Sequence, residues 1–286
     1  MKLIRFGALG QEKPGVIIAD KWYDVSGFFA DYNEAFFEED GLGKLEALLA
    51  TNPTLPEVPQ DTRLGSVVAR PSKIVCIGLN FKDHALETQV PIPTEPIIFF
   101  KSTTALCGPN DDLMIPKNSE KTDWEVELAF VIGKKASYVD ESDAMDYVAG
   151  YCLHNDYSER AYQLERGGQW AKGKGCDTFA PLGPFLATKD EIADVNNLKM
   201  WLSVNGKTYQ DSNSFNLIFE IPFLVHYLSQ FMTLLPGDVI STGTPPGVGL
   251  GVKPVPVYLK PGDVVELGIE GLGSSKQTAK AYEKNA

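Results

Sequence analysis

Residues 123–133 read DWEVELAFVIG, and this stretch indicates a sheet-rich protein more clearly than any other part of the chain. Charged and apolar side chains alternate along its first half, which is the period of a β-strand. The alternation places Asp123, Glu125 and Glu127 together on one face. Three carboxylates on one face repel one another unless something positive lies between them. The strand is therefore either half exposed, with its polar face in water, or one wall of an ion-binding site.

Short apolar runs separated by Gly, Pro and Asp turns continue on both sides of this stretch. We expect strands at residues 73–78 and 148–153, and after the two Pro-Gly-Asp turns at 236–238 and 261–263. In this part of the chain, from residue 73 onward, helices are expected only near residues 81–87, 142–146, 156–166 and 221–231. Because strands do not alternate regularly with helices, the pattern argues against a doubly wound parallel sheet. The pattern predicts a β-rich α+β fold.

The sequence pattern of the first seventy residues is typical of a separate small folding unit. Three short β-rich runs and one helix are expected there, at residues 2–6, 16–18, 22–25 and 43–50. A proline-rich linker follows at residues 53–59. We therefore predict a small N-terminal α+β domain at residues 1–70 and a main domain at residues 71–286.

Composition narrows the class of protein. The 286 residues carry 26 basic and 38 acidic side chains, a net charge of −12, which argues against nucleic-acid binding because that needs a basic face. No stretch approaches the ~20 apolar residues of a membrane span, and no secretory signal is visible. The four cysteines form no C-x-x-C pair and are expected to be reduced thiols. We expect a soluble, cytoplasmic protein that binds neither nucleic acid nor membrane.

A second acidic position follows the expected strand at 148–153. Asp156 could cap the helix expected after it, since Glu159 stands at the capping-box distance. It could equally be a third oxygen ligand beside Glu125 and Glu127, and the pattern leaves both readings open. With only three histidines and no cysteine pair, a metal here would be oxygen-coordinated, Mg²⁺ or Mn²⁺ rather than Zn²⁺.

Two further patterns have a functional and a plain reading. His84 and Glu87 share a helix face, where a carboxylate would make the imidazole a general base for water, although a surface pair is the commoner explanation. Residues 168–174 match the start of a phosphate-binding Walker loop, but Gly175 replaces its Ser or Thr, which argues against a phosphate site. The loop then presents Lys172 and Lys174, either as two solvated lysines or with a lysine held against an anionic substrate.

A third pattern is the Gly- and Pro-rich turn at residues 237–249. It exposes backbone N–H groups and the Thr244 hydroxyl, which could receive a carboxylate or could simply form a tight connection.

Taken in order, these motifs resemble the fumarylacetoacetate hydrolase family. The strings that carry the resemblance, over roughly residues 70–260, are CIGLNF at 76–81 with His84 and Glu87, PIIFFKS at 96–102, WEVEL at 124–128, Asn155-Asp156 with Arg160 and Gln163, Lys174 with DTF at 177–179, and residues 237–249. Residues 165–170 and 174–177 look most like a subgroup that cleaves 2,4-diketo-3-deoxy sugar acids such as the L-rhamnonate or L-fuconate derivatives.

The resemblance implies a mixed β-roll fold, usually a homodimer, with an N-terminal domain that some members carry. It implies Mg²⁺ or Mn²⁺ bound by Glu125, Glu127 and Asp156, with Lys174 beside the metal and His84 and Glu87 as a catalytic dyad on a lid. It implies substrate contacts from Arg160, Gln163, Thr244 and Lys101. The implied reaction is hydrolysis of the C3–C4 bond of a 2,4-dioxo acid, such as an acylpyruvate, to pyruvate and a carboxylic acid. The alternative is an oxaloacetate decarboxylase, or an isomerase or hydratase of an unsaturated 2-oxo dioic acid.

Overall fold

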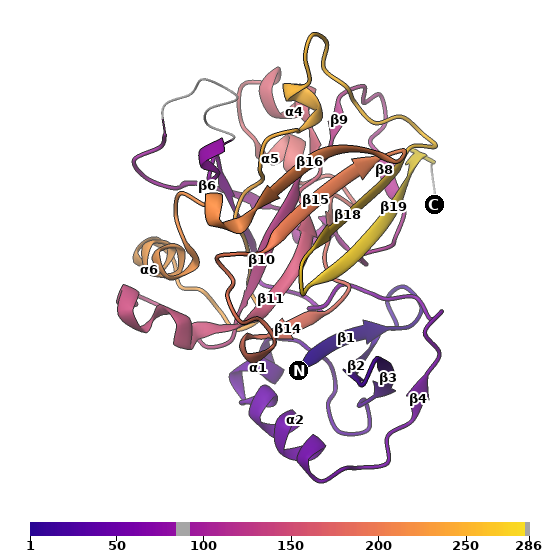
Figure 1. Cartoon of the computed structure of the whole chain (residues 1–286), viewed down its shortest axis with the longest axis vertical. Coiled ribbons are helices and arrows are strands. Elements are labelled where there is room, and N and C mark those ends of the chain that lie inside the picture. Colours follow the sequence, from indigo (N-terminus) through magenta and orange to yellow (C-terminus); the bar gives the residue numbers. More distant parts are fainter. Residues whose placement is uncertain (84–91, 284–286) are drawn as a thin grey trace.

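A long mixed sheet runs through the molecule, which a computed structural model describes at residues 1–83 and 92–283 (Figure 1). Within these ranges it has ten strands, in the spatial order β4 (Glu57–Val58), β3 (Lys21–Asp24), β2 (Lys13–Ile18), β1 (Lys2–Phe6), β14 (Leu186–Thr188), β11 (Val148–Asn155), β10 (Val126–Ile132), β17 (Val239–Ser241), β5 (Ile74–Gly78) and β6 (Ile97–Lys101). All neighbours are antiparallel except β17 and β5, which are parallel.

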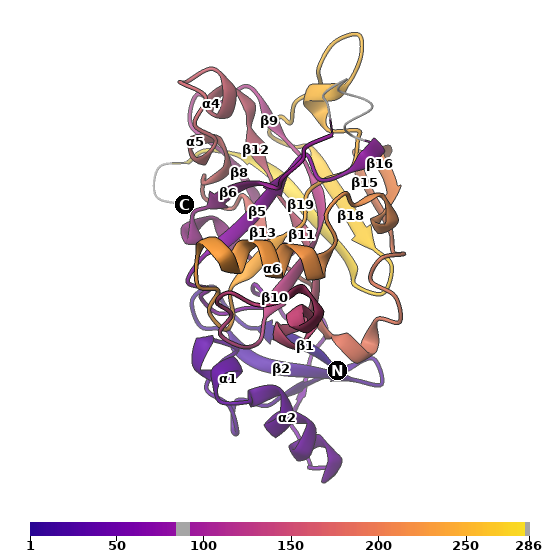
Figure 2. The ribbon, with the colours of Figure 1, turned by 90° about the vertical axis from the view of Figure 1, so that its left-hand side faces the viewer.

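A second sheet, antiparallel except at one edge, covers one face of the first. Its five strands among the described residues are β16 (Lys207–Asn213), β15 (Lys199–Val204), β18 (Val264–Ile269), β19 (Gly273–Ala281) and, parallel to β19, β8 (Leu113–Ile115). The opposite face of the long sheet carries helix α6 (Ile221–Phe231), as the two ribbon views show together (Figure 2). Every residue of β10 and β11 is buried, so these two central strands are covered on both faces.

The sequence of α6 explains why these residues form a helix. Pro222 occupies its first turn, where a missing N–H costs nothing. Its buried residues recur at helical spacing and face the sheet: Ile221, Leu224, Val225 and Leu228. The expected helix at 221–231 is confirmed in full. Within the described ranges, no helix has the length and apolarity needed to cross a bilayer.

The N-terminal segment extends the long sheet. Strand β1 pairs with β14, and the helices α1 (Glu34–Glu38) and α2 (Gly41–Ala50) lie beside it. Leu3 and Val25 belong to the same buried cluster as the residues of the central strands. The division at residue 70 stays a prediction about folding units.

The β-rich α+β fold is confirmed, but two local predictions are wrong. The expected continuous strand from residue 123 is interrupted: β9 (Thr122–Asp123) pairs with β12 (Ser158–Glu159), and β10 begins only at Val126. The expected helix at 156–166 is shortened to α4 (Arg160–Leu164), because residues 158–159 are used by that pairing. The 142–146 segment is a 3₁₀ helix, Glu141–Tyr147.

Candidate functional site

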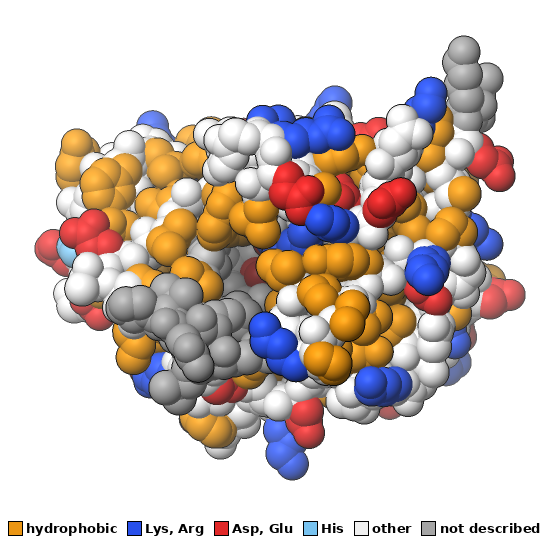
Figure 3. Space-filling view, turned by 90° about the horizontal axis from the view of Figure 1, so that it is seen from above, with side chains coloured by type: hydrophobic (Ala, Val, Ile, Leu, Met, Phe, Trp, Pro, Cys, Tyr) orange, Lys and Arg blue, Asp and Glu red, His pale blue; other side chains and the backbone are white. Residues whose placement is uncertain are grey.

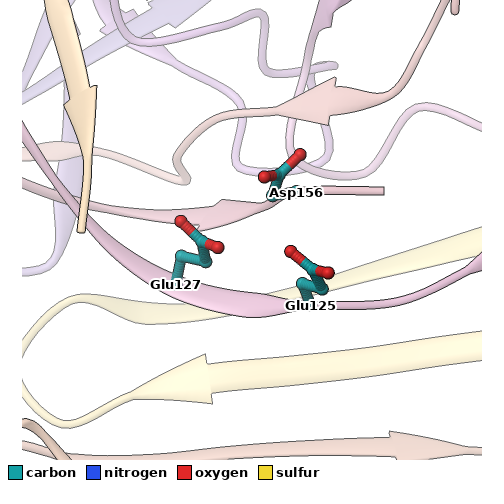
Figure 4. A group of neighbouring side chains, drawn as sticks. All are labelled: Glu125, Glu127 and Asp156. Carbon is teal, nitrogen blue, oxygen red and sulfur yellow. The ribbon is translucent and has the colours of Figure 1, made fainter. Parts of the chain in front are cut away.

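Three carboxylates converge at one end of the central strands (Figure 4). Glu125 precedes β10, Glu127 lies within it, and Asp156 follows β11. The antiparallel register pairs Val126 with Asn155, and the amide of Asp156 donates to the Glu125 carbonyl at 2.9 Å. One carboxylate oxygen from each of the three lies within 4.8 Å of the others, and all three side chains are buried. The N-cap of α4 is Glu159, whose side chain accepts from the Ala161 amide, so capping does not explain Asp156.

Cations neutralise two of these three carboxylates. The Nζ atom of Lys174 lies 2.7 Å from Glu125 and 2.8 Å from Asp156. A second buried lysine, Lys101, lies 2.5 Å from the other oxygen of Asp156, and Arg160 Nη2 lies 2.6 Å from Glu125. Burial alone would raise the pKa of Asp156, but the charges of Lys101 and Lys174 outweigh it and hold that pKa below its ordinary value.

Glu127 differs from its two neighbours. Its Oε2 atom accepts from the Ser241 hydroxyl at 2.5 Å and from the Gly243 amide at 3.0 Å. Among the described residues, no cation lies within ion-pair distance of it and no group donates to its Oε1 atom. Burial, with the charges of Asp156 and Glu125, raises its pKa well above the ordinary value.

These carboxylates fit a hard divalent cation. The donor set is all oxygen, three carboxylates within reach of one ion, which is the chemistry that Mg²⁺ and Mn²⁺ prefer. A buried negative charge without a positive partner is costly. Ionised Glu127 would be such a charge, and a cation beside it would remove that cost.

Arg160 lies between Asp123 and Glu125 and is held by three acceptors. Its Nε atom is 2.8 Å from Asp123, its Nη2 atom 2.6 Å from Glu125, and its Nη1 atom donates to Gln163 at 3.0 Å. Asp123 also accepts from the amides of Gly249 and Leu250, at 2.6 and 2.9 Å. Asp123 is therefore not a fourth member of the carboxylate group; it fixes the guanidinium and one turn of the cavity wall.

A cavity of about 480 Å³ opens above the carboxylates. Figure 3 shows it as a hollow bordered by hydrophobic side chains. Its apolar walls are mainly Ile77, Leu79, Phe99, Trp170, Val248 and Leu250. Its polar lining includes Glu125, Glu127, Arg160, Gln163, Lys174 and Thr244. A small molecule with an anionic end and an apolar or mixed remainder matches this division.

The structure brings most of the predicted site residues together. Gln163, Lys174 and Thr244 line the cavity, and the Thr244 hydroxyl donates to the Val126 carbonyl at 3.0 Å. Lys101 does not line it; its ammonium group is buried against Asp156 and the Tyr157 carbonyl. His84 and Glu87 lie outside the described residues. Lys172, exposed on the short helix Ala171–Lys174, faces away from the carboxylates and donates to the Arg166 carbonyl.

Two residues of the site were not predicted. Gln210 accepts from the Val126 amide at 2.9 Å and donates to Thr244 Oγ1 at 2.8 Å, which ties the Thr244 turn to β10. No motif surrounds Gln210, so the sequence held no signal for it. Trp170 forms a cavity wall against Phe99, with ring centroids 5.2 Å apart. It lies in a stretch that carried the subgroup resemblance and two candidate lysines, but no role was predicted for Trp170 itself.

Comparison with known proteins agrees with this geometry. Residues 73–280 match the family model described as fumarylacetoacetate (FAA) hydrolase, C-terminal. A relative from Burkholderia multivorans, named only provisionally as a hydrolase, is 54% identical over 98% of this chain and 99% of its own length.

Solved structures of similar proteins cover 99% of this chain and 100% of their own length. A fumarylacetoacetate hydrolase from Exiguobacterium antarcticum is 30% identical with a TM-score of 0.84. Maleylpyruvate hydrolase from Sphingobium sp. SYK-6, in complex with manganese(II) and pyruvate, is 29% identical with a TM-score of 0.82. A 2-hydroxyhepta-2,4-diene-1,7-dioate isomerase from Mycobacterium marinum is 30% identical with a TM-score of 0.75.

Proposed function

Because this chain belongs to the fumarylacetoacetate hydrolase family, whose members include hydrolases and isomerases, we propose that it hydrolyses the C3–C4 bond of a 2,4-dioxo acid. The products are pyruvate and a carboxylic acid. The observation that carries this proposal is the group of Glu125, Glu127 and Asp156, because Glu125 and Glu127 line a cavity that is also lined by the cations Arg160 and Lys174.

Glu125, Glu127 and Asp156 would hold a Mg²⁺ or Mn²⁺ ion. When bound, the ion acts as a Lewis acid toward the oxygens of the 2-oxo acid and offsets the negative charge that develops during cleavage. The manganese-bound relative supports this choice of metal. Its crystal also contains pyruvate, the product that we propose for this chain.

The cations of the site have a role in the same step. Lys174 keeps a buried positive charge beside Glu125 and Asp156. Burial lowers the pKa of its ammonium group, but the charges of Asp156 and Glu125 outweigh burial and raise that pKa, so the group stays protonated. A fixed positive charge stabilises an enolate more than the neutral ketone from which it forms. Arg160, with Gln163 beside it, is oriented to bind an anionic or carbonyl oxygen of the substrate.

The remaining step needs a base. In the proposed mechanism the His84–Glu87 pair takes a proton from water, whose oxygen attacks the C4 carbonyl. The C3–C4 bond then breaks, its electron pair forms the enolate of pyruvate, and protonation of C3 completes the reaction. Both residues lie outside the described ranges, so their role stays a prediction.

The group on C4 of the substrate distinguishes the candidate reactions. Sequence resemblance supports a 2,4-diketo-3-deoxy sugar acid, because residues 165–170 carry that similarity and Trp170 lines the cavity. The isomerase from Mycobacterium marinum supports a second candidate, isomerisation of an unsaturated 2-oxo dioic acid at the same site. Decarboxylation of oxaloacetate would use the same metal and cations. We expect a homodimer with no nucleic-acid or membrane partner.

A substrate panel tests this proposal. Metal-free protein is incubated with acetylpyruvate, a 2,4-diketo-3-deoxy-L-rhamnonate, oxaloacetate and an unsaturated 2-oxo dioic acid, each with and without Mg²⁺. We expect metal-dependent release of pyruvate from the diketo acids and slow turnover of the other two. Preference for oxaloacetate or for the dioic acid would replace hydrolysis by decarboxylation or isomerisation.

A further inference from the structure

We propose that His154 is a positioning residue for the Glu127 carboxylate, and that it acts through the hydroxyl of Ser241. The inference rests on the proposed metal site. It adds to that site two buried side chains from the strands on either side of β10.

The register of three neighbouring strands brings these residues together. Strand β10 lies between β11 and β17. Glu127 is directly opposite His154, and Ala129, two residues further on, is opposite Ser241. Residues opposite one another, and residues two apart on one strand, share a face of the sheet. His154, Glu127 and Ser241 are therefore on one face, and the small side chain of Ala129 leaves room for the imidazole to reach across to Ser241.

The hydrogen bonds of this group have one consistent direction. Ser241 Oγ lies 2.5 Å from Glu127 Oε2 and 2.7 Å from His154 Nδ1. A carboxylate only accepts, and a hydroxyl has one proton to give. When Glu127 is ionised, Ser241 must donate to it and must accept from Nδ1–H of His154. The same direction holds for the neutral and the protonated ring, and it assigns the proton of the neutral ring to Nδ1.

The other ring nitrogen of His154, Nε2, lowers the stability of the folded protein. His154 Nε2 is buried and has no hydrogen-bond partner among the described residues. A buried polar atom without a partner destabilises the folded state. The bond to Ser241 is the one polar contact described for this ring. An apolar side chain would avoid the cost, so the imidazole is better explained by what it does to Ser241 and Glu127 than by stability.

These hydrogen bonds determine which carboxylate oxygen of Glu127 remains free. Ser241 and the Gly243 amide both donate to Oε2, and no described group donates to Oε1. Because Nδ1–H occupies a lone pair of Ser241, the hydroxyl proton is directed at Oε2 and Oε1 remains available for the ion. Outer partners of this kind typically change metal affinity 10–100-fold when they are removed.

The test is the Kd for Mn²⁺, measured by electron paramagnetic resonance of free manganese, with no turnover involved. We expect Ser241→Ala to weaken binding about 10–100-fold and His154→Leu about 10-fold. His154→Asn should stay within about twofold of wild type, because its side-chain amide can donate to Ser241 from the place of Nδ1. In EDTA, His154→Leu should unfold at the same or a higher urea concentration than wild type, since the unpartnered nitrogen is gone.

A double variant tests whether His154 acts on Glu127 through Ser241. In the Ser241→Ala background, His154→Leu should change the Kd by less than about twofold, because its path to Glu127 is already broken. Wild-type affinity in either single variant overturns the inference, as does an equal loss from His154→Leu in both backgrounds. If the leucine variant does not fold, Ser241→Ala and His154→Asn decide the question. Wild-type protein that binds no Mn²⁺ would instead contradict the metal site itself, and the inference with it.

Discussion

Arg160 and Asp123 form a buried ion pair, with Nε of the guanidinium 2.8 Å from Oδ2 of the carboxylate. The same carboxylate accepts from the amides of Trp124, Gly249 and Leu250, so four donors occupy its two oxygens. Through this pair the segment before β10, the first turn of α4 and the turn at Gly249–Gly251 are fixed to one another.

Removing the acceptor capacity of Asp123 should destabilise the protein. Asp123→Asn keeps the shape but turns an NH₂ group toward N–H donors, and a broken buried ion pair costs about 3–5 kcal/mol. We expect the free energy of unfolding in urea to fall by about that amount. Asp112→Asn, at an exposed and loosely paired position, is the matched control and should stay within about 0.5 kcal/mol of wild type. Equal stability of the two variants would contradict the account of this pair.

Lys174 should matter more to the metal-free protein than to the loaded one. Lys174→Met leaves Glu125 and Asp156 without the cation between them, which should lower the free energy of unfolding in EDTA by about 3–5 kcal/mol. Saturating Mn²⁺ restores a positive charge there, so its stabilising effect should be larger in the variant than in wild type. The measurement is urea unfolding with and without Mn²⁺. Lys172→Met, on the exposed side of the same short helix, controls for the loss of a lysine, and a metal effect equal in all three proteins would refute this prediction.

His84 should affect turnover without affecting metal binding. General-base assistance typically contributes about 10²–10⁴-fold, so His84→Ala should lower kcat by a factor in that range. Its Kd for Mn²⁺ should match that of wild type, because the ion is assigned to three carboxylates elsewhere in the chain. Steady-state kinetics and a manganese titration check the two halves. An unchanged kcat would remove His84 from the mechanism.

The stability of the protein should depend on pH through Glu12. Burial opposes ionisation of Glu12, but the hydrogen bond from Arg63 and the charge of Arg5 outweigh it and lower the pKa of that carboxyl. A group with a lowered folded-state pKa adds stability above its unfolded-state pKa, and that stability is lost as pH falls through the folded-state value. We therefore expect Glu12→Gln to lower stability at pH 7 and to flatten its decline below about pH 4.5.

Urea unfolding between pH 3 and 7 measures this effect. Glu57→Gln is the control, because Glu57 forms an exposed pair with Lys21 and contributes little. Parallel curves for wild type and Glu12→Gln would contradict the assignment.

Much of the fold was predictable because strong local signals and packing agree. The strand at β5 and the helix at 221–231 have apolar patterns that match what they bury. For residues 123–133 the predicted type of element, a β-strand, is correct, but the strand is interrupted. The break before Val126 depends on the pairing of β9 with β12, which joins Asp123 to Ser158, and no local pattern encodes a partner so far along the chain.

The carboxylates of the site could be named from the sequence, but not their differences. Alternation along the strand and the acid after β11 suggested Glu125, Glu127 and Asp156. That cations neutralise Glu125 and Asp156 but not Glu127 depends on three side chains converging from separate segments: Lys101, Arg160 and Lys174. Gln210 and Ser241 act through hydrogen bonds across strands, so only the three-dimensional register shows them.

The central claim is metal-dependent hydrolysis of a carbon–carbon bond, and the most direct test is the fate of the oxygen of water. The diketo acid that the protein turns over fastest is incubated in H₂¹⁸O with Mg²⁺-loaded enzyme, and with Glu127→Gln as the control. We predict one ¹⁸O atom per molecule in the carboxylic acid released from the C4 side, equimolar pyruvate, and loss of both products in the variant. Turnover without a labelled carboxylic acid, or with full activity in EDTA, would contradict the account.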